Sequence, residues 1–180
     1  LGGDISCMAV AADSTRFVCT SSALFAISKG GLEALVAGHK TKTGFKDGAK
    51  TDARFNNPCG ITVDGDGNIL VSDCFNHTLR KVTRQGAVST LAGTNVAGFA
   101  DGVGAAARFN LPRGIVIDAQ GTIFVADCKN HCLRQVAPLD GTVTTLVGTG
   151  TGKGSADGQG GVARFNSPFG LALDMHGHLL

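Results

Sequence analysis

Short apolar runs separated by glycine-containing turns recur along this chain, four to a unit. In one unit the runs are Gly60–Asp64, Ile69–Asp73, Thr78–Val82 and Ala87–Leu91. In the next unit they are Ile115–Asp118, Ile123–Asp127, Cys132–Val136 and Val143–Val147. The runs are rich in Val, Ile, Thr and Leu, residues that favour pleated and packed strands, so each unit is predicted to form four short strands.

The alternation of apolar and polar positions within these strands is incomplete. Ile69–Val71 is apolar on both faces, as expected for a small sheet that packs against a neighbour on each side. Leu79 and Val82 are three positions apart, whereas strict alternation requires an even number. This spacing predicts a bulge or a strong twist in the third strand.

The units are copies of one another. Gly44–Val82 aligns without a gap on Gly98–Val136, and 22 of the 39 positions are identical. A third copy of this segment opens at Gly154, and Pro58, Pro112 and Pro168 recur at intervals of 54 and 56 residues. Four-stranded units of this length with two apolar faces favour radial packing into a β-propeller over a solenoid.

The predicted fold is therefore all-β, a propeller segment with about three blades and part of a fourth. Residues 1–180 form a single domain, with blades at 1–38, 57–93, 111–148 and, incomplete, 167–180, and spacers at 39–56, 94–110 and 149–166. The first blade is the most divergent. Met8–Val10 and Arg16–Cys19 occupy the places of its first two strands.

The spacers are long for loops inside a compact domain, and such loops normally carry structure or function. Asp101–Asn110 is predicted to hold one helical turn with Asp101 near its start. Phe55, Phe109 and Phe165 occupy equivalent positions, and we expect them to pack as apolar plugs between adjacent sheets.

Composition and net charge limit which classes of partner the chain is expected to bind. The chain is 43% hydrophobic and 17% charged with a formal net charge of +2, too weak a charge to indicate a nucleic acid or an anionic membrane as partner. No apolar stretch approaches the length of a membrane span, and no signal peptide is evident. We expect the natural N-terminus to lie upstream, and the sequence does not predict a compartment. The six cysteines contain no CxxC pair and are interpreted as scattered buried thiols.

Most of the titratable residues recur at matched positions, which favours a structural role. Asp73 and Arg80, like Asp127 and Arg134, are seven residues apart, and we expect each pair to join the second strand to the third. His77 and His131 face equivalent surroundings and do not converge, so we expect hydrogen bonds within their own turns. Arg54, Arg108 and Arg164 recur in the spacers. We predict no catalytic residue, metal or cofactor.

Both full copies carry a recognisable signature. Asn76, His77 and Leu79 match Asn130, His131 and Leu133, and these segments resemble the NHL repeat in its long-spacer form. The resemblance implies a propeller, usually of six blades, with the Pro-Gly-Ile strand innermost. Because the copies here do not close such a ring, we expect either a fragment of a longer chain or a half-propeller that self-association or a second chain completes.

The preferred function is a non-catalytic protein-interaction scaffold with a protein partner. One alternative is part of a six-bladed enzyme of the metal-dependent lyase or lactonase type. A second is RNA binding, which the absence of Trp and Tyr disfavours. Partner contacts are expected where the copies differ on exposed turns. The candidate positions are Phe75 and Lys129, together with Arg113 and Phe169 at the place of Cys59.

Overall fold

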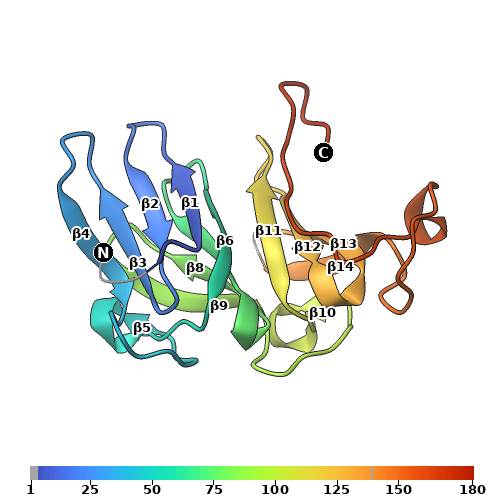
Figure 1. The fold of residues 1–180 in the computed structure, drawn as a ribbon, viewed down its shortest axis with the longest axis horizontal. Helices are drawn as coiled ribbons and strands as arrows, with labels where there is room; N and C mark the ends of the chain where they lie inside the picture. The colour runs from blue at the N-terminus through green and yellow to red at the C-terminus, as the bar shows by residue number, and fades with distance from the viewer. Residues whose placement is uncertain (1–3, 139) are drawn as a thin grey trace.

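The computed structural model describes residues 4–138 and 140–180. Its strands form three antiparallel sheets, here called blades 1 to 3 (Figure 1). Blade 1 contains β1 (Cys7–Val10), β2 (Arg16–Cys19), β3 (Ala23–Ile27) and β4 (Glu33–Gly38). Blade 2 contains β5 (Gly48–Ala49), β6 (Pro58–Val63), β7 (Ile69–Asp73), β8 (Thr78–Val82) and β9 (Ala87–Gly93). Blade 3 contains β10 (Gly102–Val103), β11 (Pro112–Ile117), β12 (Ile123–Asp127), β13 (Cys132–Val136) and β14 (Thr142–Val147).

The predicted strands of blades 1 to 3 are present, and the four main strands of each blade follow an up-and-down order. The incomplete fourth blade predicted at 167–180 forms no named strand, only a hairpin with a bridge between Leu173 and Leu179. The observed bounds agree with the apolar runs to within one residue, with three exceptions. β6 and β11 begin two and three residues earlier, at Pro58 and Pro112, and β9 ends two residues later, at Gly93.

The predicted irregularity of the third strand was wrong. β8 pairs with β7 without a register shift, and the extra residue where β8 meets β9 is Leu91 of β9. Leu79 and Val82 are both buried because they lie on opposite faces of the sheet, Leu79 in the core between blades 2 and 3 and Val82 in the core between blades 1 and 2.

The spacers add a strand that the sequence did not predict. β5 pairs with β9, and β10 pairs with β14, so each spacer extends the sheet of the blade that follows it. The expected helical turn is a 3-10 turn at Gly104–Ala106, whose N-cap is Val103 and which has no side-chain cap. The placement of Asp101 at a helix start was therefore wrong, since its carboxylate binds Arg134 instead.

The 3-10 turns recur with the repeat. They span Lys50–Asp52 (η1), Cys74–Asn76 (η2), Gly104–Ala106 (η3), Cys128–Asn130 (η4) and Gly160–Val162 (η5). No helix in the described ranges is long and apolar enough to cross a membrane.

The inner strand β6 lies between the inner strands β1 and β11 and contacts both (Figure 1). Two glycines permit such close packing. A Cβ on Gly60 of β6 would collide with the carbonyl oxygen of Arg113 in β11, and a Cβ on Gly114 of β11 would lie 2.6 Å from the carbonyl oxygen of Phe169 in the C-terminal segment. The Gly114 amide also donates a 2.8 Å hydrogen bond to Phe169 O. The C-terminal segment thus continues the row of inner strands beside β11, as in a propeller.

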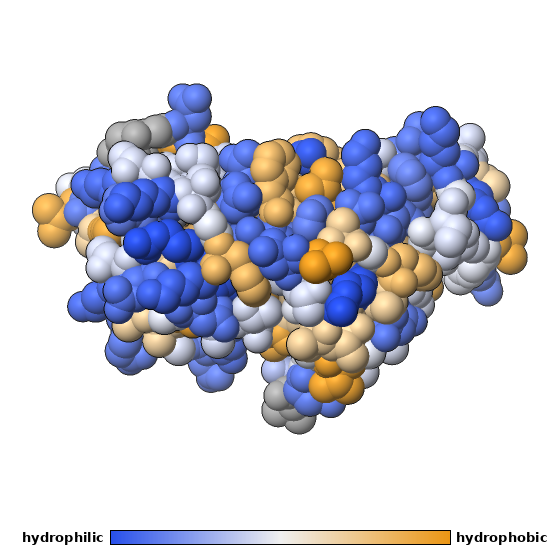
Figure 2. Space-filling model, turned by 90° about the horizontal axis from the view of Figure 1, so that it is seen from below, coloured by the Kyte–Doolittle hydropathy of each residue, from blue (hydrophilic) through white to orange (hydrophobic). Residues whose placement is uncertain are grey.

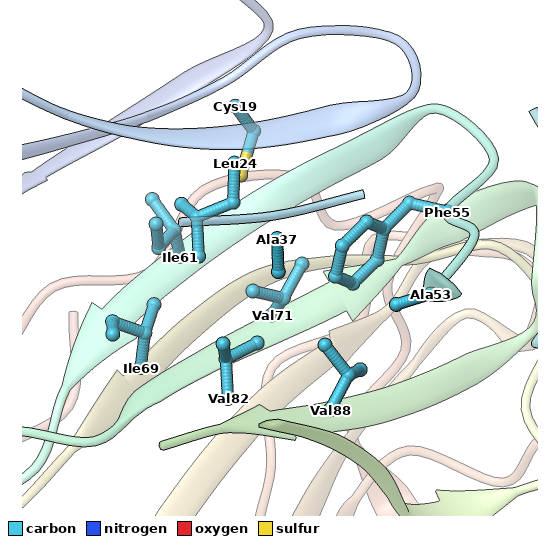
Figure 3. Packing of buried hydrophobic residues seen from close by; sticks show 10 residues of the cluster. All are labelled: Cys19, Leu24, Ala37, Ala53, Phe55, Ile61, Ile69, Val71, Val82 and Val88. Carbon is cyan, nitrogen blue, oxygen red and sulfur yellow. The ribbon is translucent and has the colours of Figure 1, made fainter. Parts of the chain in front are cut away.

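The core lies between blades rather than within one sheet. Phe55 packs with Cys19 and Leu24 of blade 1 and with Val71 of blade 2 (Figure 3). Phe109 fills the equivalent space between blades 2 and 3, which confirms the plug role for both residues. Phe165 is only half-buried, since the few residues beyond it build one short hairpin rather than a full sheet to cover its ring.

Candidate functional site

The densest polar cluster of blade 2 surrounds the guanidinium group of Arg80. Arg80 and Asp73 are both fully buried, and Arg80 Nη1 lies 2.7 Å from Asp73 Oδ2. Arg80 Nη2 lies 2.6 Å from Asp47 Oδ1 in the spacer and donates to the Lys46 carbonyl at 2.9 Å. The guanidinium carbon lies 5.1 and 5.3 Å from the ring centroids of two spacer phenylalanines, Phe45 and Phe55. Arg80 therefore holds the spacer against strands β7 and β8.

Asp73 is satisfied by further donors. The Asn56 amide donates to Asp73 Oδ1 at 2.8 Å, and Asn76 Nδ2 donates to Asp73 Oδ2 at 2.8 Å. Burial raises the pKa of Asp73 to about 6, with these hydrogen bonds and Arg80 acting in the opposite direction. The carboxylate is closed off by structural donors and faces no open space.

Blade 3 repeats this cluster group for group. Arg134 lies 2.8 Å from Asp127 and 2.6 Å from Asp101, and its guanidinium carbon lies 5.0 and 5.2 Å from the rings of Phe99 and Phe109. The spacing of seven residues therefore does produce the Asp–Arg pair it indicates. Identical geometry in two blades marks the cluster as part of the blade's construction.

The two signature histidines join neighbouring blades. His77 and His131 both adopt the left-handed conformation, with φ of 55° and 53°. His77 Nδ1 accepts the Leu111 amide at 3.1 Å, and His131 Nδ1 accepts the Ser167 amide at 3.0 Å. The expectation of hydrogen bonds within the turn was wrong, because a left-handed residue at the end of the 3-10 turn directs the ring toward the next inner strand. Burial lowers the pKa of His77, which favours the neutral ring that this acceptor role requires.

Blade 1 shows how the same junction is made without a histidine. Its shorter turn places the carbonyl oxygen of Ser21 where the imidazole would be, and it accepts the Asn57 amide at 2.8 Å. The spacer arginines are structural as well. Arg54, Arg108 and Arg164 each donate to carbonyl oxygens of the adjacent 3-10 turn.

The positions that differ between copies lie at the end of the molecule where the inner strands begin. Phe75, in η2, is 46% exposed, and Lys129 occupies the equivalent place in η4. Arg113 and Phe169 are brought together, with the guanidinium carbon 4.5 Å from the ring centroid, and Phe169 stays 61% exposed. On this end of the molecule apolar residues occur in small groups among hydrophilic ones (Figure 2).

The cysteines are less scattered than the sequence suggested. All six are free thiols, but Cys7 stands opposite Cys19 in the register of β1 and β2, and Cys59 of β6 and Cys74 of η2 lie on two elements that contact each other. The second pair depends on two features of the fold, the pairing of Pro58 with Asp73 and the Cys59 side chain that turns back to the Asn57 carbonyl oxygen. Within residues 4–138 and 140–180, no group of three or more His, Cys, Asp or Glu side chains is arranged to hold a metal ion.

Comparison with known proteins agrees with this architecture. Residues 55–82 and 109–136 match the model of the NHL repeat. The chain is a partial β-propeller and belongs to the NHL-repeat family.

Two relatives share part of their sequence with this chain. The chain is 38% identical over 98 residues, 53% of its length, to protein SUPPRESSOR OF QUENCHING 1, chloroplastic, of Arabidopsis thaliana. It is 34% identical over 140 residues, 71% of its length, to NHL repeat-containing protein 2 of Bos taurus. It spans only 9% and 19% of those proteins.

Among solved structures, a protein of unknown function from Bacteroides thetaiotaomicron matches 99% of the chain with a TM-score of 0.82 at 23% identity. Virginiamycin B lyase from Staphylococcus aureus also matches 99% of it, with a TM-score of 0.66 at 10% identity. The chain covers 44% and 48% of these two structures. At such identities the likeness is one of fold.

Proposed function

We propose that this NHL-repeat segment is a non-catalytic scaffold that binds a protein partner through the end where its inner strands begin. One observation carries the proposal. The Asp, Asn and Arg side chains that recur in the two full repeats hold each spacer against its own blade, and the recurring His side chains join neighbouring blades. The positions that differ between copies instead expose Phe75, Lys129 and Phe169.

The chemistry of this end suits a protein surface. Exposed aromatic rings next to arginine are the side chains enriched at the centres of protein interfaces. Arg113 is held against Phe169, so less conformational entropy is lost when a partner orders the pair. A partner that presents apolar side chains beside carboxylates would complement them.

The experiment compares proteins recovered from a lysate by three immobilised chains. These are the wild type, the double variant Phe75→Ser/Phe169→Ser, and Gln120→Ser, which alters an exposed hairpin turn at the other end. We expect one set of proteins to be retained by the wild type and by Gln120→Ser and lost from the double variant. Equal recovery by all three chains would contradict the proposed surface.

We further propose that a second copy of the chain packs against the exposed face of β1 in blade 1. Alternate residues of β1 turn away from blade 2, and Met8 and Val10 are 57% and 61% exposed. In a larger propeller a neighbouring blade would cover this face. Sedimentation of the wild type against Met8→Ser/Val10→Ser tests this. Self-association that the variant loses supports this proposal, and a monomeric wild type refutes self-association through this face.

A further inference from the structure

Two thiols meet at the start of the inner strand of blade 2. The register of β6 on β7 pairs Pro58 with Asp73 and then shifts, which leaves Cys59 in an irregularity of the strand. Cys74 follows Asp73 directly and opens η2. Cys59 Sγ turns back to within 3.2 Å of the Asn57 carbonyl oxygen, and the Phe75 amide, next to Cys74, donates to the Asn56 carbonyl at 3.0 Å. Both thiols therefore lie against the same short stretch of backbone, residues 56–57.

The thiols differ in access. Cys59 is half-buried, and its Sγ lies 3.2 Å from the Asn57 carbonyl oxygen. Cys74 is completely buried. A reagent from solution can therefore reach Cys59 first, with Cys74 behind it.

This pair breaks the repeat. Cys128 is the equivalent of Cys74 in blade 3, but Arg113 replaces Cys59 there. Two blades that share the same buried cluster thus differ at this place, where blade 2 has Cys59 beside Cys74 and blade 3 has Arg113 beside Cys128. The blade's construction does not require the pair, and Cys128 supplies a matched internal control.

The electrostatics assign different roles to the two sulfurs. The hydrogen bond with Cys74 lowers the pKa of Cys59 to about 7, and the Arg113 guanidinium acts in the same direction while burial opposes both. The same hydrogen bond, together with burial, raises the pKa of Cys74 far above its ordinary range. Because Cys59 is also the thiol that solvent reaches, Cys59 is the nucleophile and Cys74 is the thiol that reacts second.

We propose that Cys59 and Cys74 form a reversible disulfide by exchange with a low-molecular-weight disulfide such as oxidised glutathione. The Cys59 thiolate attacks one sulfur of the reagent, its S–S bond breaks, and one glutathione thiolate leaves. Cys74 then attacks the Cys59 sulfur and expels the second glutathione, while its proton passes to a departing thiolate. Two protein thiols are oxidised and one glutathione disulfide is reduced to two glutathione thiols.

Tryptic mapping makes the test specific. No Lys or Arg lies between Phe55 and Thr78, so Cys59 and Cys74 share one peptide, residues 55–80. Cys7 and Cys19 fall on separate peptides, as do Cys128 and Cys132. A Cys59–Cys74 bond therefore appears as peptide 55–80 lighter by two hydrogens and resistant to alkylation, whereas a Cys7–Cys19 bond joins two peptides.

The experiment treats the reduced, folded chain with oxidised glutathione and then alkylates and digests it. We expect the light form of peptide 55–80 in the wild type and in Cys128→Ser. Cys74→Ser should stop at a glutathione adduct on Cys59. Cys59→Ser should leave Cys74 alkylatable only after unfolding. Reduction with dithiothreitol should restore both thiols.

Three results would overturn the proposal. The first is a wild-type peptide 55–80 whose two thiols stay free. The second is a wild-type adduct on Cys59 that Cys74 never resolves. The third is a light peptide that forms only in urea, because the bond would then belong to the unfolded chain. If Cys74→Ser does not fold, the wild type and Cys59→Ser decide the outcome by themselves.

Discussion

Replacing Arg80 with methionine tests the buried cluster of blade 2. Methionine retains most of the apolar stem but leaves the fully buried Asp73 carboxylate without its cation. Breaking a buried ion pair in this way costs about 3–5 kcal/mol. The variant also loses the hydrogen bonds to the Arg54 and Lys46 carbonyl oxygens. We therefore expect the free energy of unfolding to fall by roughly 3–5 kcal/mol.

Urea denaturation followed by circular dichroism measures this change, and a thermal melt offers a second readout. At about 2–4 °C per kcal/mol for a chain of this size, Tm should drop by roughly 6–20 °C. Lys42→Met, which removes an exposed charge, should stay within about 0.5 kcal/mol of the wild type. Adding Asp73→Asn to Arg80→Met should cost less than the sum of the single changes, since both partners of the pair are then removed. An Arg80→Met variant within about 1 kcal/mol of the wild type would refute the reasoning.

Three further results are expected. Phe109→Ala should lower the free energy of unfolding, measured in urea, by about 3–5 kcal/mol. Phe165→Ala should lower it by clearly less, because Phe165 is half-buried. Equal losses would contradict the role of Phe109 as a plug between blades. His77→Gly removes the imidazole that accepts the Leu111 amide hydrogen bond, so hydrogen exchange at the Leu111 amide should become faster. Unchanged protection of this amide would show that the hydrogen bond does not hold the two blades together. The rate of Cys59 alkylation by iodoacetamide should rise with pH to a midpoint near its pKa of about 7; a midpoint near 8.5, the ordinary thiol value, would exclude an activated thiolate.

The strands of blades 2 and 3 follow from local sequence because their apolar runs are bounded by turn residues. Asp64, for example, accepts the amides of Asp66 and Asn68 within its hairpin, an interaction that sequence alone suggests. The Asp73–Arg80 pair is local for the same reason, since adjacent antiparallel strands bring residues seven apart together.

Features that depend on register or on a neighbouring blade were missed. The added strands β5 and β10 have no apolar pattern, because each pairs through only two residues at the sheet edge. The imidazole of His77 reaches 34 residues along the chain to Leu111, and no periodicity within one copy reveals that distance. The proximity of Cys59 and Cys74 depends on the pairing of Pro58 with Asp73 and on the direction of the Cys59 side chain toward the Asn57 carbonyl oxygen, neither of which a local pattern predicts.

The central claim is that the repeated polar residues build the blades while the variable exposed positions bind a protein. The most direct measurement is the Kd of a recovered partner for the wild type and for Phe75→Ser/Phe169→Ser, by isothermal titration calorimetry. If these rings are interface anchors worth about 2 kcal/mol or more, Kd should rise roughly 30-fold or more, with Tm unchanged. An unchanged Kd for the folded variant would contradict the account.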